Sequence, residues 1–182
     1  MNYGICNLSN IPLRKEPDHK SEMISELLFG DHFKVIDTAK NWVKIKLNDD
    51  DFEGWIENAQ CESISEKYYI ELTEDQTTFS NNLIDFIEDK DANLFSIILG
   101  SKLPSYKDKT FILHDKKYVY DGNISQHKHP KQNIVKTAFM YLNSPFLWGG
   151  KTPFGIDCSG FTQMVYKING YKLFRNVAQQ AT

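Results

Sequence analysis

The stretch FLWGGKTPFGIDCSGFTQMVYKI, residues 146–168, joins a glycine-rich turn, a single cysteine and a run with helical spacing. Glycine and proline break regular structure in its first half, and apolar residues then recur every three or four positions. Asp157 precedes the apolar run and is a suitable N-cap, and Gly170 follows it and is suited to end a helix. The pattern therefore predicts a helix that begins at Cys158.

A cysteine in the first turn of a helix faces unpaired backbone N–H groups and a partial positive charge. Both favour the thiolate, so Cys158 is a candidate nucleophile, and the same N–H groups can stabilise an acyl oxyanion. Ser159 and Gly160 are small and leave the sulfur accessible. The pattern by itself also allows a second interpretation, in which Cys158 is a half-buried structural residue.

The composition indicates a folded protein without an electrostatic preference for polyanions. The chain has 182 residues, 41% of them hydrophobic, which suits one or two small domains. A net charge of -3 gives no basis for binding nucleic acid or an anionic membrane. No segment approaches the roughly 20 apolar residues of a membrane span, and the N-terminus lacks the features of a signal peptide. We therefore expect a cytoplasmic protein; a periplasmic or secreted location follows instead if a leader has been removed.

The remaining cysteines and histidines do not predict a cofactor. Cys6 and Cys61 either form a bridge or stay as two free thiols, and three dispersed cysteines do not make a disulfide framework. His127 and His129 lie two positions apart in a polar segment, where such a pair binds a metal weakly at best. No further Cys, His or acid is spaced to complete a zinc site, so we interpret this segment, residues 125–133, as a linker.

Three regions follow one another along the chain. Residues 1–66 predict a small β module, because short strand-like runs alternate with polar turns. We expect Trp42 and Trp55 in its core. Residues 67–130 predict a second, degenerate β module followed by the linker, and residues 131–182 change to helical spacing.

Two of these regions resemble known families. The motif FLWGGKTPFGIDCSGF, followed by VYKINGYKLFRNVAQQ, closely resembles the NlpC/P60 family of papain-like cysteine peptidases. The first 66 residues resemble the bacterial SH3 (SH3b) module through IPLRKEP, SEMISELLFGD, NWVKIK and EGWI. The resemblance implies an α+β multidomain fold, with small SH3-like β-barrel modules before the helical N-terminal part of a papain-like domain.

The resemblance also implies a function and a set of site residues. It points to γ-D-glutamyl-L-diamino acid endopeptidases, which act on peptidoglycan-derived peptides in cell-wall degradation or murein recycling. They cut stem peptides with a free N-terminal L-Ala between γ-D-Glu and the diamino acid. Cys158 matches the nucleophile and Asp157 the residue that holds the free amine, with Ser159 in the same pocket. Glu22 matches the acid that the SH3b module supplies, and Trp148 belongs to the substrate-binding set.

Two departures from the family pattern limit these expectations. Phe52 stands where the family has a tyrosine near the amine, so either Phe52 keeps only the packing role or the amine pocket differs. All five histidines precede Cys158, whereas the family's catalytic histidine follows the cysteine. We therefore expect the chain to be a fragment of a longer protein and inactive by itself. The alternatives are a natural remnant that binds wall peptides or a partner protein without cutting, and a permuted relative that uses an upstream histidine.

Overall fold

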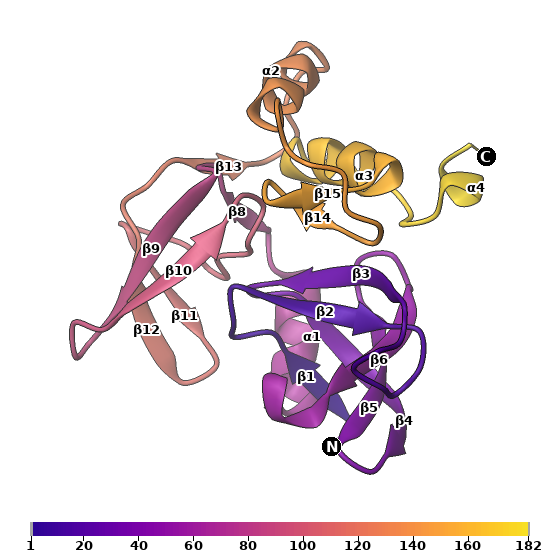
Figure 1. The fold of residues 1–182 in the computed structure, drawn as a ribbon. Helices are drawn as coiled ribbons and strands as arrows, with labels where there is room; N and C mark the ends of the chain where they lie inside the picture. The colour runs from indigo at the N-terminus through magenta and orange to yellow at the C-terminus, as the bar shows by residue number, and fades with distance from the viewer. Residues whose placement is uncertain (1, 182) are drawn as a thin grey trace.

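The computed structural model describes residues 2–181, and most of its regular structure is β-sheet with a few helices (Figure 1). This composition agrees with the α+β class expected from the sequence. Figure 1 shows the N-terminal sheet in indigo and purple, the hairpins of the middle region beside it, and the C-terminal helices in orange and yellow next to both.

The N-terminal region forms a seven-stranded sheet with the order β3-β2-β6-β5-β4-β1-β7. Its strands are β1 (Tyr3–Ile5), β2 (Asn10–Arg14), β3 (Met23–Leu28), β4 (His32–Ala39), β5 (Trp42–Leu47), β6 (Glu53–Glu57) and β7 (Glu62–Ser63), with the short 3-10 helix η1 (Asn58–Gln60) before β7. Val43, Ile45 and Leu47 of β5 are buried and alternate with half-buried residues, as their spacing predicts. The expectation for Trp42 and Trp55 is wrong, because both lie half-buried on the other face of their strands.

The middle region contains antiparallel strand pairs and one helix that the sequence pattern did not predict. Its elements are α1 (Glu66–Glu74), β8 (Thr78–Ser80), β9 (Ile84–Asp89), β10 (Leu94–Ile98), β11 (Thr110–Leu113), β12 (Lys116–Val119) and β13 (Ile124–Gln126). Four strands form a sheet with the order β10-β9-β12-β11, and β13 pairs with β8. In α1 the Ser65 side chain caps the N-terminus, and Tyr69 and Leu72 are buried on one face.

The C-terminal region is helical, as predicted. It contains α2 (Gln132–Met140), the short strands β14 (Lys151–Thr152) and β15 (Gly155–Ile156), α3 (Cys158–Ile168) and α4 (Val177–Gln180). Gly170 has a φ of +81°, the left-handed conformation that commonly ends a helix. The predicted start of α3 at Cys158 and its end before Gly170 are therefore both confirmed.

The three regions pack against one another through shared clusters of buried apolar residues. Leu28 of β3 lies in one cluster with Met164 of α3, and the neighbouring Phe29 lies in another cluster with Ile97 of β10. The segment interpreted as a linker is also anchored, because β13 pairs with β8 and the His129 N–H donates to the Asn169 carbonyl. Within residues 2–181, no helix is long and apolar enough to cross a membrane.

Candidate active site

Cys158 occupies the first position of α3, and its side chain is exposed. The preceding Asp157 has extended backbone, and its carboxylate accepts a hydrogen bond of 2.7 Å from the Gly160 N–H. The predicted N-cap is therefore confirmed. The arrangement presents the sulfur to solvent at the end of the helix where backbone N–H groups favour a negative charge.

Asp157 is held inside the protein by Arg175, which lies after α3. The guanidinium donates to both carboxylate oxygens, at 3.0 and 2.7 Å, and both residues are buried. This bidentate geometry is the strongest form of an arginine–carboxylate pair. The Gly149 N–H donates a further bond of 2.9 Å to the same carboxylate. Burial alone would raise the pKa of Asp157, but the hydrogen bonds from Arg175 and Gly160 outweigh it, so the pKa lies below its usual value.

Arg175 also organises two serines beside this pair. Its Nη1 donates to the Ser159 hydroxyl at 2.7 Å, and its Nε donates to the Ser25 hydroxyl of β3 at 3.1 Å. Ser159 and Asp157 are thus brought together as predicted, although as partners of an arginine. Arg175 lies within the family motif, but the sequence predicted no role for it. A lone arginine after an Asp-capped helix was the available signal, and the sequence did not show that the two would meet.

Glu22 and Trp148 lie 126 positions apart and form a direct contact. The indole Nε1–H donates to the Glu22 carboxylate at 2.8 Å, and both side chains are exposed. The hydrogen bond from Trp148 and then the contact with Lys15 lower the pKa of Glu22. The β module therefore contributes a carboxylate to the surface beside the loop that leads into α3.

That loop packs tightly against β3. Gly149 has a φ of +78°, and a Cβ at this position would lie 2.5 Å from the Met23 carbonyl oxygen. Only glycine fits there, which explains the Trp-Gly-Gly sequence. The backbone N–H of Lys151 donates to the buried Glu26 carboxylate at 2.7 Å, which fixes the loop a second time.

The structure also places the remaining cysteines, Phe52 and the two linker histidines. Cys6 and Cys61 are free thiols, so the bridge is absent and the alternative holds. Phe52 is half-buried and packs against the core of the N-terminal sheet. Within residues 2–181, no three His, Cys, Asp or Glu side chains are grouped to hold a metal ion. His129 contacts the Ser125 hydroxyl at 2.9 Å, and His127 contacts Gln76.

Two family models match the chain, one near each end. Residues 13–60 match the bacterial dipeptidyl-peptidase Sh3 domain, and residues 143–182 match the NlpC/P60 family. The second match includes Trp148, Asp157, Cys158 and Arg175.

Curated relatives with similar sequences are named as peptidases. Dipeptidyl-peptidase 6 of Lysinibacillus sphaericus is 28% identical over 90% of this chain and 68% of its own length. The gamma-D-glutamyl-L-lysine dipeptidyl-peptidase of Bacillus cereus is 23% identical over 88% of this chain. This chain spans 55% of the length of that second protein.

Solved structures share the fold. An NlpC/P60 family protein from Bacillus cereus superposes with a TM-score of 0.82 and 18% identity, covering 98% of this chain and 76% of its own. An NlpC/P60 endopeptidase from Photobacterium damselae gives 0.77 and 20% identity, covering 98% of this chain and 45% of its own. The resemblance of this chain to NlpC/P60 proteins with an N-terminal bacterial SH3 domain is therefore confirmed.

Proposed function

We propose that this protein is an NlpC/P60 cysteine peptidase that hydrolyses peptidoglycan stem peptides, with Cys158 as the nucleophile. The observation that carries the proposal is the exposed thiol at the first position of α3, behind an aspartate that Arg175 holds in place. A thiol there has helix N–H groups on one side and solvent on the other. Peptidase names among the relatives support the reaction class.

In the proposed reaction, the Cys158 thiolate attacks the carbonyl carbon of the scissile amide. A thioester forms between Cys158 and the acyl fragment while the C–N bond breaks, and the amine of the diamino acid leaves with the proton that the thiol gave up. Water then attacks the thioester, which releases the carboxylic acid and restores the thiol. Backbone N–H groups at the start of α3 stabilise the oxyanion of each tetrahedral intermediate.

We further propose cleavage between γ-D-Glu and a diamino acid, in peptides whose N-terminal L-Ala carries a free amine. The Glu22 carboxylate supports this specificity, because it is exposed, ionised and held beside Trp148 in a position where it can pair with an ammonium group. Asp157 is a weaker candidate for that pairing, because Arg175, Gly149 and Gly160 already donate to its oxygens.

The test is cleavage of L-Ala-γ-D-Glu-L-Lys and of its meso-diaminopimelate counterpart, followed by mass spectrometry. It uses the protein purified from its own cells beside the 182-residue chain. We expect release of L-Ala-D-Glu by the former and no turnover by the latter. Cys158→Ala should abolish release, whereas Cys61→Ala, the matched control, should retain it. Full activity in Cys158→Ala would overturn the proposal.

A second candidate function is peptide or partner binding without cleavage. It is favoured by the position of all five histidines before Cys158 in the sequence, opposite to the order expected for the family. A pull-down on purified peptidoglycan distinguishes the two. Binding that survives Cys158→Ala, with no release of L-Ala-D-Glu by the cell-derived protein, would establish the binding function instead.

We also propose domain boundaries and a cellular location for this protein. We assign residues 1–66 to an SH3b domain, residues 67–130 to a second, degenerate SH3b-like module and linker, and residues 131–182 to the N-terminal part of a papain-like domain. A cytoplasmic location is supported by three free cysteines, since thiols stay reduced there. Cell fractionation with an antibody to the chain tests it.

A further inference from the structure

A cavity of about 260 Å³ lies where the three regions meet, near the C-terminal end of α3. Its lining residues come from the N-terminal sheet and its turns, from α1 and β8, and from α3 and the segment that follows it. Neither Cys158, Asp157 and Ser159 nor Glu22 and Trp148 line it. The volume is far above the ~10–15 Å³ that a single water requires, so the cavity has room for a small organic molecule.

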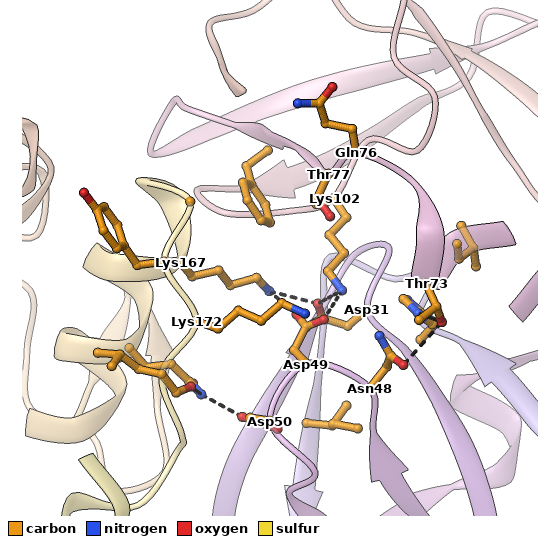
Figure 2. A pocket seen from close by; sticks show the side chains of 18 of the residues that line it. Asp31, Asn48, Asp49, Asp50, Thr73, Gln76, Thr77, Lys102, Lys167 and Lys172 are labelled. Atoms are coloured by element: carbon orange, nitrogen blue, oxygen red, sulfur yellow. Dashed lines mark hydrogen bonds and ion pairs between the residues drawn. The ribbon is translucent and has the colours of Figure 1, made fainter. Parts of the chain in front are cut away.

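Two lysines at the base of this cavity are paired with two aspartates. Lys102 lies 2.6 Å from Asp49 and 3.6 Å from Asp31, and Lys167 of α3 lies 2.9 Å from Asp31 and 3.4 Å from Asp49. Figure 2 shows the two lysines reaching the two aspartates from different segments of the chain. The four charges neutralise one another, so Asp31 and Asp49 are already engaged.

Lys151 of β14 lines the same cavity, but its side-chain nitrogen has no partner. The residue is 3% exposed, and within residues 2–181 this nitrogen makes no hydrogen bond or ion pair. The third aspartate of the cavity, Asp50, already accepts hydrogen bonds from Gln163 Nε2 at 2.7 Å and from the Phe52 N–H at 3.1 Å. A buried amine without a partner is rare in a folded protein and calls for a ligand from outside the chain.

The Lys151 nitrogen is open to the cavity. Among residues 2–181, the unpaired side-chain nitrogen and oxygen atoms that have almost no accessible surface belong to His32, Asn81, Tyr141 and Gln163. The unpaired nitrogen of Lys151 is not one of these atoms, so it keeps accessible surface. Because Lys151 is otherwise buried and lines the cavity, that surface faces the cavity and a ligand there can reach it.

The surroundings of Lys151 favour the neutral amine over the ammonium. Burial is the largest influence and lowers the pKa of Lys151. The charges of Lys167 and Arg175 lower it further, and the opposing influence of Asp31 and Asp50 does not restore it to its ordinary value. A neutral lysine amine attacks carbonyl carbon, and burial or a neighbouring cation is the usual means by which proteins produce one.

We propose that Lys151 is a carbonyl-binding residue and that the cavity takes a small aldehyde or ketone, which Lys151 holds as an imine. The amine nitrogen attacks the carbonyl carbon. The C=N bond then forms while the C–O bond breaks, and both amine hydrogens leave with the oxygen as one water molecule, so no oxidant or reductant takes part. The carbon chain of the ligand lies against apolar residues of the lining, namely Leu47, Leu72, Phe79 and Leu173.

The experiment treats the 182-residue chain with a low concentration of propanal and with sodium cyanoborohydride, which reduces an imine to a stable secondary amine. Mass spectrometry of proteolytic peptides then gives the rate of adduct formation at each lysine. At pH 7 we expect Lys151 to react about tenfold faster than the exposed Lys116 and Lys117 of β12, because a pKa lowered by one unit gives about ten times more neutral amine.

Two matched controls lie within the same chain and need no variant. Lys102 and Lys167 line the same cavity but are ion-paired, so neither should react faster than Lys116. In urea, where the chain is unfolded, the advantage of Lys151 should disappear. A dextran polymer that carries aldehyde groups cannot enter the cavity, so it should modify Lys116 and leave Lys151 unmodified.

A variant gives an independent measurement. Lys151→Met keeps the length of the side chain but removes the amine, so the fast adduct, one per chain by intact mass, should be lost. Lys116→Met should retain it. If Lys151→Met does not fold, as judged by circular dichroism, the rates at each lysine of the wild-type chain decide the question.

Two results would overturn the proposal. Reaction of Lys151 no faster than that of Lys116 in the folded chain would mean that its nitrogen is not a free amine within reach of the cavity. An advantage of Lys151 that persists in urea or with the dextran polymer would mean that the cavity plays no part. Cyanoborohydride does not fix aldehyde adducts on the Cys158 thiol, so neither result bears on the proposed peptidase activity.

Discussion

The two ends of α3 both carry buried charged and polar residues, but they differ in how completely those residues are hydrogen-bonded. At the N-terminal end, Arg175 and backbone N–H groups satisfy the buried Asp157 carboxylate completely from within the chain. At the C-terminal end, Lys167 joins a balanced ion-pair network, yet the buried Gln163 Oε1 and His32 Nδ1 have no hydrogen-bond partner among residues 2–181.

The difference shows where hydrogen bonding within the chain is complete and where it is not. A carboxylate with a full set of donors fixes the start of the helix, so the exposed thiol of Cys158 has a defined position. Buried polar atoms without a hydrogen-bond partner, such as Gln163 Oε1 and His32 Nδ1, cost the folded protein free energy. One end is therefore suited to holding a reactive atom in place, whereas the other leaves part of its hydrogen bonding unsatisfied.

The largest expected effect comes from removing the arginine at the N-terminal end. Arg175→Leu leaves Asp157 buried without its partner and should lower the free energy of unfolding by about 3–5 kcal/mol. Arg14→Leu is the matched control, since Arg14 makes one hydrogen bond to a carbonyl and should lose only about 0.5–1.5 kcal/mol. Urea unfolding followed by circular dichroism measures both. Equal losses would mean that the pair does not hold the end of the helix.

Acid should weaken both ends together. Lysine neighbours outweigh burial and lower the pKa of Asp31 and Asp49, and Arg175 does so for Asp157. A carboxylate with a lowered folded-state pKa stabilises the protein above its unfolded pKa of about 3.9 and loses that contribution as the pH falls. Stability should therefore decline steeply below about pH 4.

A single variant tests the share of the ion-pair network in that decline. Asp49→Asn should make the loss of unfolding free energy between pH 5 and pH 2 shallower, because one carboxylate no longer takes up a proton. Asp91→Asn, at an exposed position, should leave the slope unchanged. Identical slopes in wild type and Asp49→Asn would argue that the network does not govern acid unfolding.

A smaller loss of unfolding free energy is expected at the C-terminal end of α3. Gln163→Leu removes the orphaned Oε1 but also leaves Asp50 and the Leu173 carbonyl without a donor, so the net loss should be about 1–3 kcal/mol. Gln132→Leu, at an exposed position of α2, should change stability by less than about 0.5 kcal/mol. A loss in Gln163→Leu as large as that in Arg175→Leu would erase the contrast between the two ends.

The smallest effect concerns the surface contact beside Cys158. Trp148→Phe removes the hydrogen bond to Glu22, so the pKa of Glu22 should rise toward its ordinary value while the unfolding midpoint stays the same. NMR titration of the Glu22 side chain measures the shift. Lys15→Gln, which removes the second contact of Glu22, should give a smaller rise. A larger rise in the Lys15 variant would reverse the assigned order of causes.

Local sequence determined several features of this protein. The capping aspartate, the helix from Cys158 and the glycine that ends it follow from rules that act over a few residues. So does the alternation in β5. Helix α1 was missed because its apolar face is short and the surrounding strands suggested a β module, although Ser65 was a local capping signal.

Tertiary structure alone decided which distant residues meet. Arg175 reaches Asp157, Glu22 meets Trp148 across 126 positions, and Lys102 and Lys167 converge on Asp31 and Asp49. The half-buried positions of Trp42 and Trp55 also depend on which face of the sheet is covered. Sequence periodicity reports which residues share a face, whereas ion pairing and cavities depend on how separate elements pack, and that packing is settled by the whole chain.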